Sequence, residues 1–98
     1  MTVREVKEMG ITIDGFVRTL PNAAGQWCIT REGMQFQLSH PHHTGAVISI
    51  LLQPLPPRRI ASLTLPVTQV ELQFEGLNTA QVSQFLQRFD LYYHKGGG

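Results

Sequence analysis

Three histidines, His40, His42 and His43, lie within four positions of one another in the polar stretch Ser-His-Pro-His-His-Thr-Gly. Imidazole is the commonest metal-binding side chain in proteins. If the stretch is extended, side chains 40 and 42 point the same way, so two ring nitrogens can reach one ion. Glu71 or His94 would have to complete the site by folding. A polar loop that is rich in histidine is the favoured interpretation, with a metal site at His40, His42 and His43 as one alternative and proton transfer or ligand contact as the other.

Arg58 and Arg59 form the second candidate site. Two adjacent guanidinium groups can grip a carboxylate or a phosphate bidentately. Neighbouring side chains alternate along a strand, and a charged strand edge also prevents edge-to-edge pairing. We therefore expect either an anion-binding site or a solvated strand edge. The strand expected at Ala46–Gln53 would hold these arginines about 25 Å from His43, which disfavours a joint site.

No catalytic motif is recognisable in the sequence. It contains no Gly-rich phosphate loop, no Gly-x-Ser-x-Gly, no paired-cysteine motif and no His-Glu-x-x-His. Asp14 and Asp90 are the only aspartates and lie at opposite ends of the chain. We therefore expect no catalytic residues and no cofactor, and a non-catalytic role is favoured over an enzyme.

The composition is that of one small globular domain. Of the 98 residues, 42% are hydrophobic and 15% are charged, with a formal net charge of +1. We expect a single domain over residues 1–95 and a flexible glycine tail at 96–98. The near-neutral balance argues against nucleic-acid binding, which uses a clustered basic face. The longest apolar run, Ala46–Leu52, is far shorter than the roughly 20 residues that span a membrane, so no membrane contact is expected.

Cys28 is the only cysteine, so the chain cannot form an intrachain disulfide. This favours a reducing compartment and a cytoplasmic location. Its position in an expected strand indicates a structural thiol. The alternative is a reactive thiol near Arg31, the one neighbouring cation that could lower its pKa.

Low net charge leaves little repulsion between copies, which favours self-association. Phe16 lies opposite Ile13 and Val17 in its expected strand, so that strand is either buried on both sides or uses Phe16 for a ligand or subunit contact. Tyr92 and Tyr93 lie near the end of the chain, where aromatic side chains often pack on a partner. Phe16, Tyr92 and Tyr93 are therefore the predicted interface residues of a homodimer or of a complex with another protein.

The clearest structural signal is a strand followed by a helix. Hydrophobic residues alternate with polar ones from Gln69 to Glu75, which is typical of a strand with one buried face. Asn78 and Gln81 have the types and spacing of a capping box. The stripe that follows is typical of an amphipathic helix and consists of Val82, Phe85, Leu86 and Phe89. The last residues, 90–95, either extend this helix or form a final extended piece.

The rest of the chain reads mainly as strands. The expected strands are Ile11–Leu20, Gln26–Thr30, Met34–Leu38, Ala46–Gln53 and Arg58–Leu65. Turn residues predict loops at 21–25, 31–33 and 39–45 and a stiff proline connector at 54–57. The segment 3–9 is either a short helix or an edge strand.

These elements predict an α+β fold. The expected architecture is an antiparallel β-meander of five to six strands, open or curled into a barrel-like shape, with one C-terminal amphipathic helix packed on it. We expect a binding or protein-interaction module that acts through a sheet face or edge. The alternative is a metal- or anion-binding protein, or an enzyme, that uses the loop of His40, His42 and His43.

Overall fold

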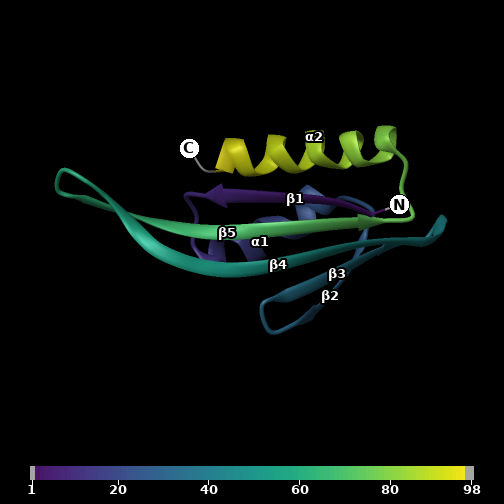
Figure 1. The fold of residues 1–98 in the computed structure, drawn as a ribbon, viewed down its shortest axis with the longest axis horizontal. Coiled ribbons are helices and arrows are strands. Elements are labelled where there is room, and N and C mark those ends of the chain that lie inside the picture. The colour runs from purple at the N-terminus through teal and green to yellow at the C-terminus, as the bar shows by residue number, and fades with distance from the viewer. Residues whose placement is uncertain (1, 97–98) are drawn as a thin grey trace.

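The computed structural model describes residues 2–96 and contains one five-stranded sheet and two helices (Figure 1). The elements are β1 (Thr2–Met9), α1 (Ile13–Ala24), β2 (Cys28–Glu32), β3 (Gln35–His40), β4 (His43–Ile60), β5 (Leu63–Glu75) and α2 (Thr79–Gly96). The strands are antiparallel and follow the order β1-β5-β4-β3-β2. The predicted α+β fold with an antiparallel sheet and a C-terminal helix is confirmed, and the sheet is open rather than closed into a barrel.

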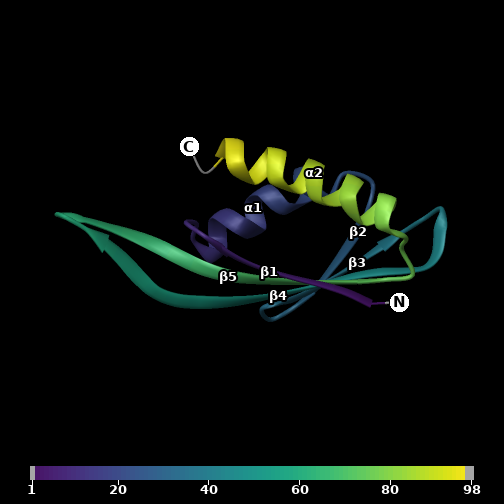
Figure 2. The same cartoon turned by 45° about the horizontal axis from the view of Figure 1, so that its top comes forward.

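Both helices lie on the same face of the sheet (Figure 2). Alternation along the strands explains this layering, because successive side chains point to opposite faces. On β5, Val70, Leu72 and Phe74 are buried beneath the helices, while the residues between them are polar. We call the opposite side, which neither of the two described helices covers, the open face.

The largest correction concerns residues 11–25, where the helix α1 (Ile13–Ala24) replaces the expected strand and turn. Thr12 caps α1, because its hydroxyl oxygen accepts a hydrogen bond from the backbone N–H of Gly15 at 3.0 Å. The buried residues of this helix are Phe16, Leu20, Ala23 and Ala24, which follow helical spacing. Pro21 lies inside the helix, which ends at Gly25. The expected turn was therefore wrong as well.

The helix predicted near the C-terminus is confirmed together with its capping box. The backbone N–H of Gln81 donates to Asn78 Oδ1 at 2.8 Å, and the backbone N–H of Asn78 donates to Gln81 Oε1 at 2.9 Å. The helix runs through residues 90–95, so its buried stripe gains Tyr93. Residues 97–98 of the predicted glycine tail lie outside the described residues.

The core lies between the sheet and the two helices and is rich in aromatic rings. Phe16 contacts Phe36 of the sheet and Phe89 of α2, with ring centroids 6.2 and 6.1 Å apart. Tyr93 stacks on Phe16 at 4.8 Å. These contacts pack α1 and α2 against each other and against the sheet, so the fold depends on both helices.

The segment from β4 to β5 is one long hairpin, which corrects two predictions. The expected connector at 54–57 belongs to β4, and the expected strand Arg58–Leu65 is interrupted by a turn at Ala61 and Ser62. A register irregularity between Leu55 and Arg58 accommodates the prolines. The last residue of β4 that pairs with β3 is Leu51. The backbone N–H of Leu52 still donates to the carbonyl oxygen of Met34. Beyond Leu52, the outer edge of β4 is unpaired within residues 2–96, and proline is tolerated at an unpaired edge.

The remaining differences between the predicted and the observed elements each concern one short segment. The segment 3–9 is the edge strand β1. The predicted loop 39–45 shrinks to a turn at Pro41 and His42, so that His40 and His43 are paired positions on β3 and β4. Across residues 2–96, neither helix combines the length and apolar character needed to cross a membrane.

Candidate ligand-binding cleft

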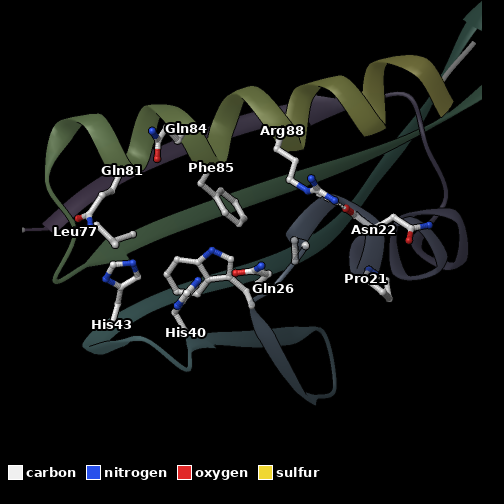
Figure 3. A pocket seen from close by; sticks show the side chains of 13 residues that line it. Pro21, Asn22, Gln26, His40, His43, Leu77, Gln81, Gln84, Phe85 and Arg88 are labelled. Carbon is white, nitrogen blue, oxygen red and sulfur yellow. Dashed lines mark hydrogen bonds between the residues drawn. The ribbon is translucent and has the colours of Figure 1, made fainter.

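A cleft of about 630 Å³ lies between the N-terminal half of α2 and the segments that approach it from below (Figure 3). Three parts of the chain that are distant in sequence line it. They are the end of α1 with the loop that leads to β2 (Pro21, Asn22, Ala24, Gly25, Gln26, Trp27), the strand ends at the β3–β4 turn (His40, His43) and α2 with the residues before it (Leu77, Gln81, Gln84, Phe85, Arg88). The volume falls within the roughly 300–1,000 Å³ typical of small-molecule sites.

Trp27 forms the aromatic wall of the cleft. Its ring stands nearly perpendicular to the rings of His40 and Phe85, at centroid distances of 5.0 and 6.0 Å. Trp27 is only half-buried, so part of the indole remains open. Phe85 is held in turn against Phe74 of the sheet at 5.6 Å. The wall is therefore anchored in the core and is rigid before any ligand arrives.

The β3–β4 turn fixes the tautomer of His40. Its Nδ1 accepts a hydrogen bond from the backbone N–H of His42 at 3.1 Å, which leaves Nε2 to carry the proton of the neutral ring. The pKa of His40 is lowered from its ordinary value of 6.5, first by partial removal from solvent and then by the charges of His43 and His42. Near pH 7, His40 is therefore a neutral hydrogen-bond donor.

Arg88 supplies a positive charge at the other end of the cleft. Its Nε and Nη2 donate to the backbone carbonyl oxygen of Asn22 at 3.1 and 3.0 Å, and its guanidinium carbon lies 4.9 Å from the ring centroid of Tyr92. These contacts hold the guanidinium group in place. Among the side chains described for residues 2–93 and the backbone of residues 2–96, no hydrogen bond engages its Nη1, so two N–H donors of this cation are free.

Gly25 makes room for this arginine. It has φ +68°, and a Cβ at this position would lie 2.9 Å from Arg88 Nε. Real Cβ atoms do not approach other heavy atoms that closely, so a side chain at position 25 would displace the guanidinium group. The glycine that ends α1 therefore also positions the charge in the cleft.

Among the described residues that line the cleft, Arg88 carries the one permanent charge, and the others are neutral or histidine side chains. Arg88, His40 and His43 are accompanied by four amide side chains, Asn22, Gln26, Gln81 and Gln84. Among the described residues that line the cleft there is no aspartate or glutamate. A carboxylate ligand would therefore meet donors without repulsion from a like charge.

The structure separates the predicted site residues. His40 and His43 line the cleft, whereas Arg58 and Arg59 lie at the far end of β4 near the tip of the hairpin. Arg58 is paired with Leu65 and Arg59 with Thr64, so the two arginines point to opposite faces, as the alternation of a strand predicts. Their anion binding stays a prediction.

Two of the three predicted interface residues are inside the molecule. Phe16 is fully buried and Tyr93 nearly so, because residues 13–24 form a helix that packs between the sheet and α2. The prediction that they are exposed was wrong. Tyr92 is half-buried beneath Arg88, and its role in an interface stays a prediction. Cys28 is exposed on β2.

The histidine cluster is compact. The ring centroid of His40 lies 4.6 Å from that of His43 and 5.8 Å from that of His42. In the described part of the chain, no group of three or more His, Cys, Asp or Glu side chains is arranged to hold a metal ion. The metal site stays a prediction.

Sequence reasoning missed most of the cleft. Trp27 and Phe85 were assigned to the core alone and Gln81 to the capping box alone, and Gln84 and Arg88 were not singled out. A signal was present, since Gln81, Gln84 and Arg88 follow at i, i+3 and i+7 and thus form a polar stripe beside the apolar stripe of α2. The sequence did not indicate that residues 21–27 and 40–43 would face this stripe.

Comparison of this chain with protein-family models and with curated proteins finds no match.

Proposed function

We propose that this chain is a small binding protein whose cleft takes an organic anion with a flat apolar part, of which an aromatic carboxylate is the simplest form. The proposal develops the anion-binding alternative raised by the sequence, with the cleft in place of the isolated histidine loop. It rests mainly on one observation: the fixed guanidinium group of Arg88 has free donors in a cleft whose wall is the aromatic pair Trp27 and Phe85.

The anionic part of the proposed ligand follows from the guanidinium group of Arg88, and its apolar part follows from the aromatic rings in the lining. Guanidinium binds carboxylate with charge-assisted hydrogen bonds, which are stronger than those between neutral groups. The edge of Trp27 and the buried ring of Phe85 favour an apolar ring. The amide side chains can then fix its orientation, as a few polar groups do in most small-molecule sites. The first turn of α2, which contains no acidic residue, adds a partial positive charge at the same end of the sheet.

Fluorescence of Trp27 tests the proposal directly, because it is the only tryptophan in the chain. Titration with benzoate should change the emission saturably, whereas benzamide, which has the same ring without the charge, should bind much more weakly. Equal responses to the two probes, or no saturable response to benzoate, would contradict the proposed ligand class.

Arg88→Gln is the informative variant, and Arg18→Gln is its matched control. A hydrogen bond to a charged group contributes about 1.5–3 kcal/mol, so Arg88→Gln should weaken benzoate binding about tenfold or more. Arg18 is exposed on α1 and does not line the cleft, so its replacement should leave binding unchanged. Similar losses in both variants would indicate general attraction by positive charge and not a site at Arg88.

A further inference from the structure

The β4–β5 hairpin projects beyond the rest of the molecule (Figures 1 and 2). Pairing with β1 ends at Thr68 and pairing with β3 ends at Leu51. We call residues 54–67, which lie beyond both limits, the arm. Three of its large aliphatic side chains are well exposed: Ile60 by 53%, Leu63 by 63% and Leu65 by 42%. Exposed apolar side chains concentrated on a projecting hairpin indicate a surface that a partner covers.

The exposed residues of the arm share one face. Ile60 is directly opposite Leu63, and Arg58 is directly opposite Leu65. Directly opposite residues point to the same side, as do alternate residues along one strand. Leu63 and Leu65 also keep the alternation of β5, which continues to Glu71 and Glu75 on the open face. The arm face is therefore an apolar continuation of the open face and carries one guanidinium group.

The edges of the arm are unsuited to pairing with another strand. Pro54, Pro56 and Pro57 lie on β4, and Pro66 lies on β5. Proline lacks the amide donor that a further strand requires, and natural sheets use it to protect exposed edges. A partner would therefore meet the face of the arm, not its edge.

Outside the arm, the open face of the sheet is acidic and has an apolar centre. Val6 and Leu51 are both exposed, by 49% and 46%, and flank Glu71 from the neighbouring strands. Glu8 and Glu75 lie on the same face as Glu71. We call this area of Val6, Leu51, Glu8, Glu71 and Glu75 the body face.

The charges of the arm and the body face are complementary. Arg4, which also lies on the open face, forms an ion pair with Glu71 at 2.6 Å, whereas among the side chains described for residues 2–93 Glu8 and Glu75 form no ion pair. On its face the arm carries Arg58, whereas Arg59 points to the other face, and the arm contains no acidic residue. An apolar arm with positive charge thus matches an apolar centre with negative charge.

From these features we infer a two-fold homodimer in which the arm face of each copy lies on the body face of the other. A second copy is the partner that supplies the acidic surface, because each chain carries both halves of the contact. One chain cannot make the contact with itself, since its arm and body face belong to the same continuous strands β4 and β5. Two-fold symmetry makes the contact twice, as in most homodimers. The inference is independent of the cleft, which lies on the helix side of the sheet.

Sedimentation equilibrium of the whole chain tests the inference. We expect a mass of twice 11.0 kDa that shifts towards the monomer as salt rises, because the charged part of the contact is screened. A monomer at every concentration up to the solubility limit would overturn the inference.

Leu63→Glu should yield a monomer, because it places a carboxylate in the apolar centre of the contact. Leu91→Glu is the control, since Leu91 is equally exposed, by 63%, but lies on α2. It should leave the dimer intact. Circular dichroism should show the fold unchanged in both variants, because neither side chain belongs to the core. A folded Leu63→Glu variant that stays a dimer would overturn the inference.

A charge exchange tests the specific pairing without depending on the apolar residues. One variant carries Arg58→Glu, and the other carries Glu8→Lys with Glu75→Lys. Each should dissociate alone, because like charges then face each other. Mixing the two should restore a heterodimer, since both of its contacts again join opposite charges. If the mixture stays monomeric, or if each variant alone dimerises as well as the natural chain, the proposed contact is wrong.

Discussion

The hydroxyl group of Tyr93 donates a hydrogen bond to the backbone carbonyl oxygen of Phe16 at 2.8 Å, and the two rings stack with an interplanar angle of 13°. The contact joins the last helix to the first across 77 positions of sequence. It is buried, so both the stacking and the hydrogen bond act away from water. Together with the contacts of Phe89 and Arg88, Tyr93 therefore holds α1 against α2.

Tyr93→Phe should lower the free energy of unfolding by about 1 kcal/mol. The substitution keeps the stacked ring and removes only the hydrogen bond, whose net contribution is of this order. Chemical denaturation provides the measurement. Tyr92→Phe is the control, because the Tyr92 hydroxyl makes only a 3.5 Å contact with Arg88 at the surface. A Tyr93→Phe variant as stable as the control would show that the hydrogen bond contributes nothing.

Alkaline pH should destabilise the natural chain more than Tyr93→Phe. Burial raises the pKa of Tyr93 well above its ordinary value of 10.0. The unfolded chain therefore releases this proton near pH 10 while the folded chain retains it, so stability is fully present below pH 10 and falls above it. The slope is at most about 1.4 kcal/mol per pH unit. Denaturation curves at pH 8 and above pH 10 measure this loss of stability. If the natural chain and Tyr93→Phe lose the same stability between the two pH values, the assignment to Tyr93 is contradicted.

Gly76→Ala should destabilise the fold more than Gly33→Ala. Both glycines have positive φ, +72° and +63°, so both substitutions impose a similar backbone strain of about 1 kcal/mol. A Cβ at position 76 would also collide with the backbone carbonyl oxygen of Gly45, whereas a Cβ at position 33 would meet open space. The difference in melting temperature between the two variants isolates the collision. Equal losses would show that the β5–α2 turn moves away from Gly45 at little cost.

His40 should titrate below pH 6.5 in NMR spectra of the ring protons. Partial removal from solvent and the charges of His43 and His42 lower its pKa, and protonation of Nδ1 would also break the hydrogen bond from the His42 amide. Because the folded pKa is lowered, this group's contribution to stability is present above pH 6.5 and is lost as pH falls. His43→Gln should move the midpoint upward. A midpoint at or above 6.5 in the natural chain would contradict the arrangement of the turn.

Local signals predicted α2 well because all its determinants are close in sequence. The capping box of Asn78 and Gln81 uses residues three positions apart, and the stripe that contains Phe85 and Phe89 repeats with the period of a helix. The strand before it was predicted for the same reason, since one face of β5 is buried and the other is polar. Both predictions needed only short-range periodicity.

The sequence was misleading for α1 because its hydrophobic residues fit both the two-residue repeat of a strand and the 3.6-residue repeat of a helix. Ile11, Ile13 and Val17 are β-favouring and suggest alternation, and Pro21 suggests a turn. The helix forms because Phe16 and Leu20 then point to one side and fill the space between the sheet and α2. The stability gained by burying these two side chains depends partly on residues of α2, which are more than 50 positions away. A short stretch of sequence therefore does not indicate it.

The sequence by itself determined the α+β class, the antiparallel pairing and the amphipathic C-terminal helix, since these follow from alternation, short connections and capping between near neighbours. Only the tertiary structure decided that the prolines 54–57 continue a strand, because β3 ends opposite Leu51 and leaves their edge unpaired. It also decided that His40, Trp27 and Arg88 share a cleft. The physical reason is the same in each case: edges and clefts are formed by segments that meet in space, and no local pattern records which segments meet.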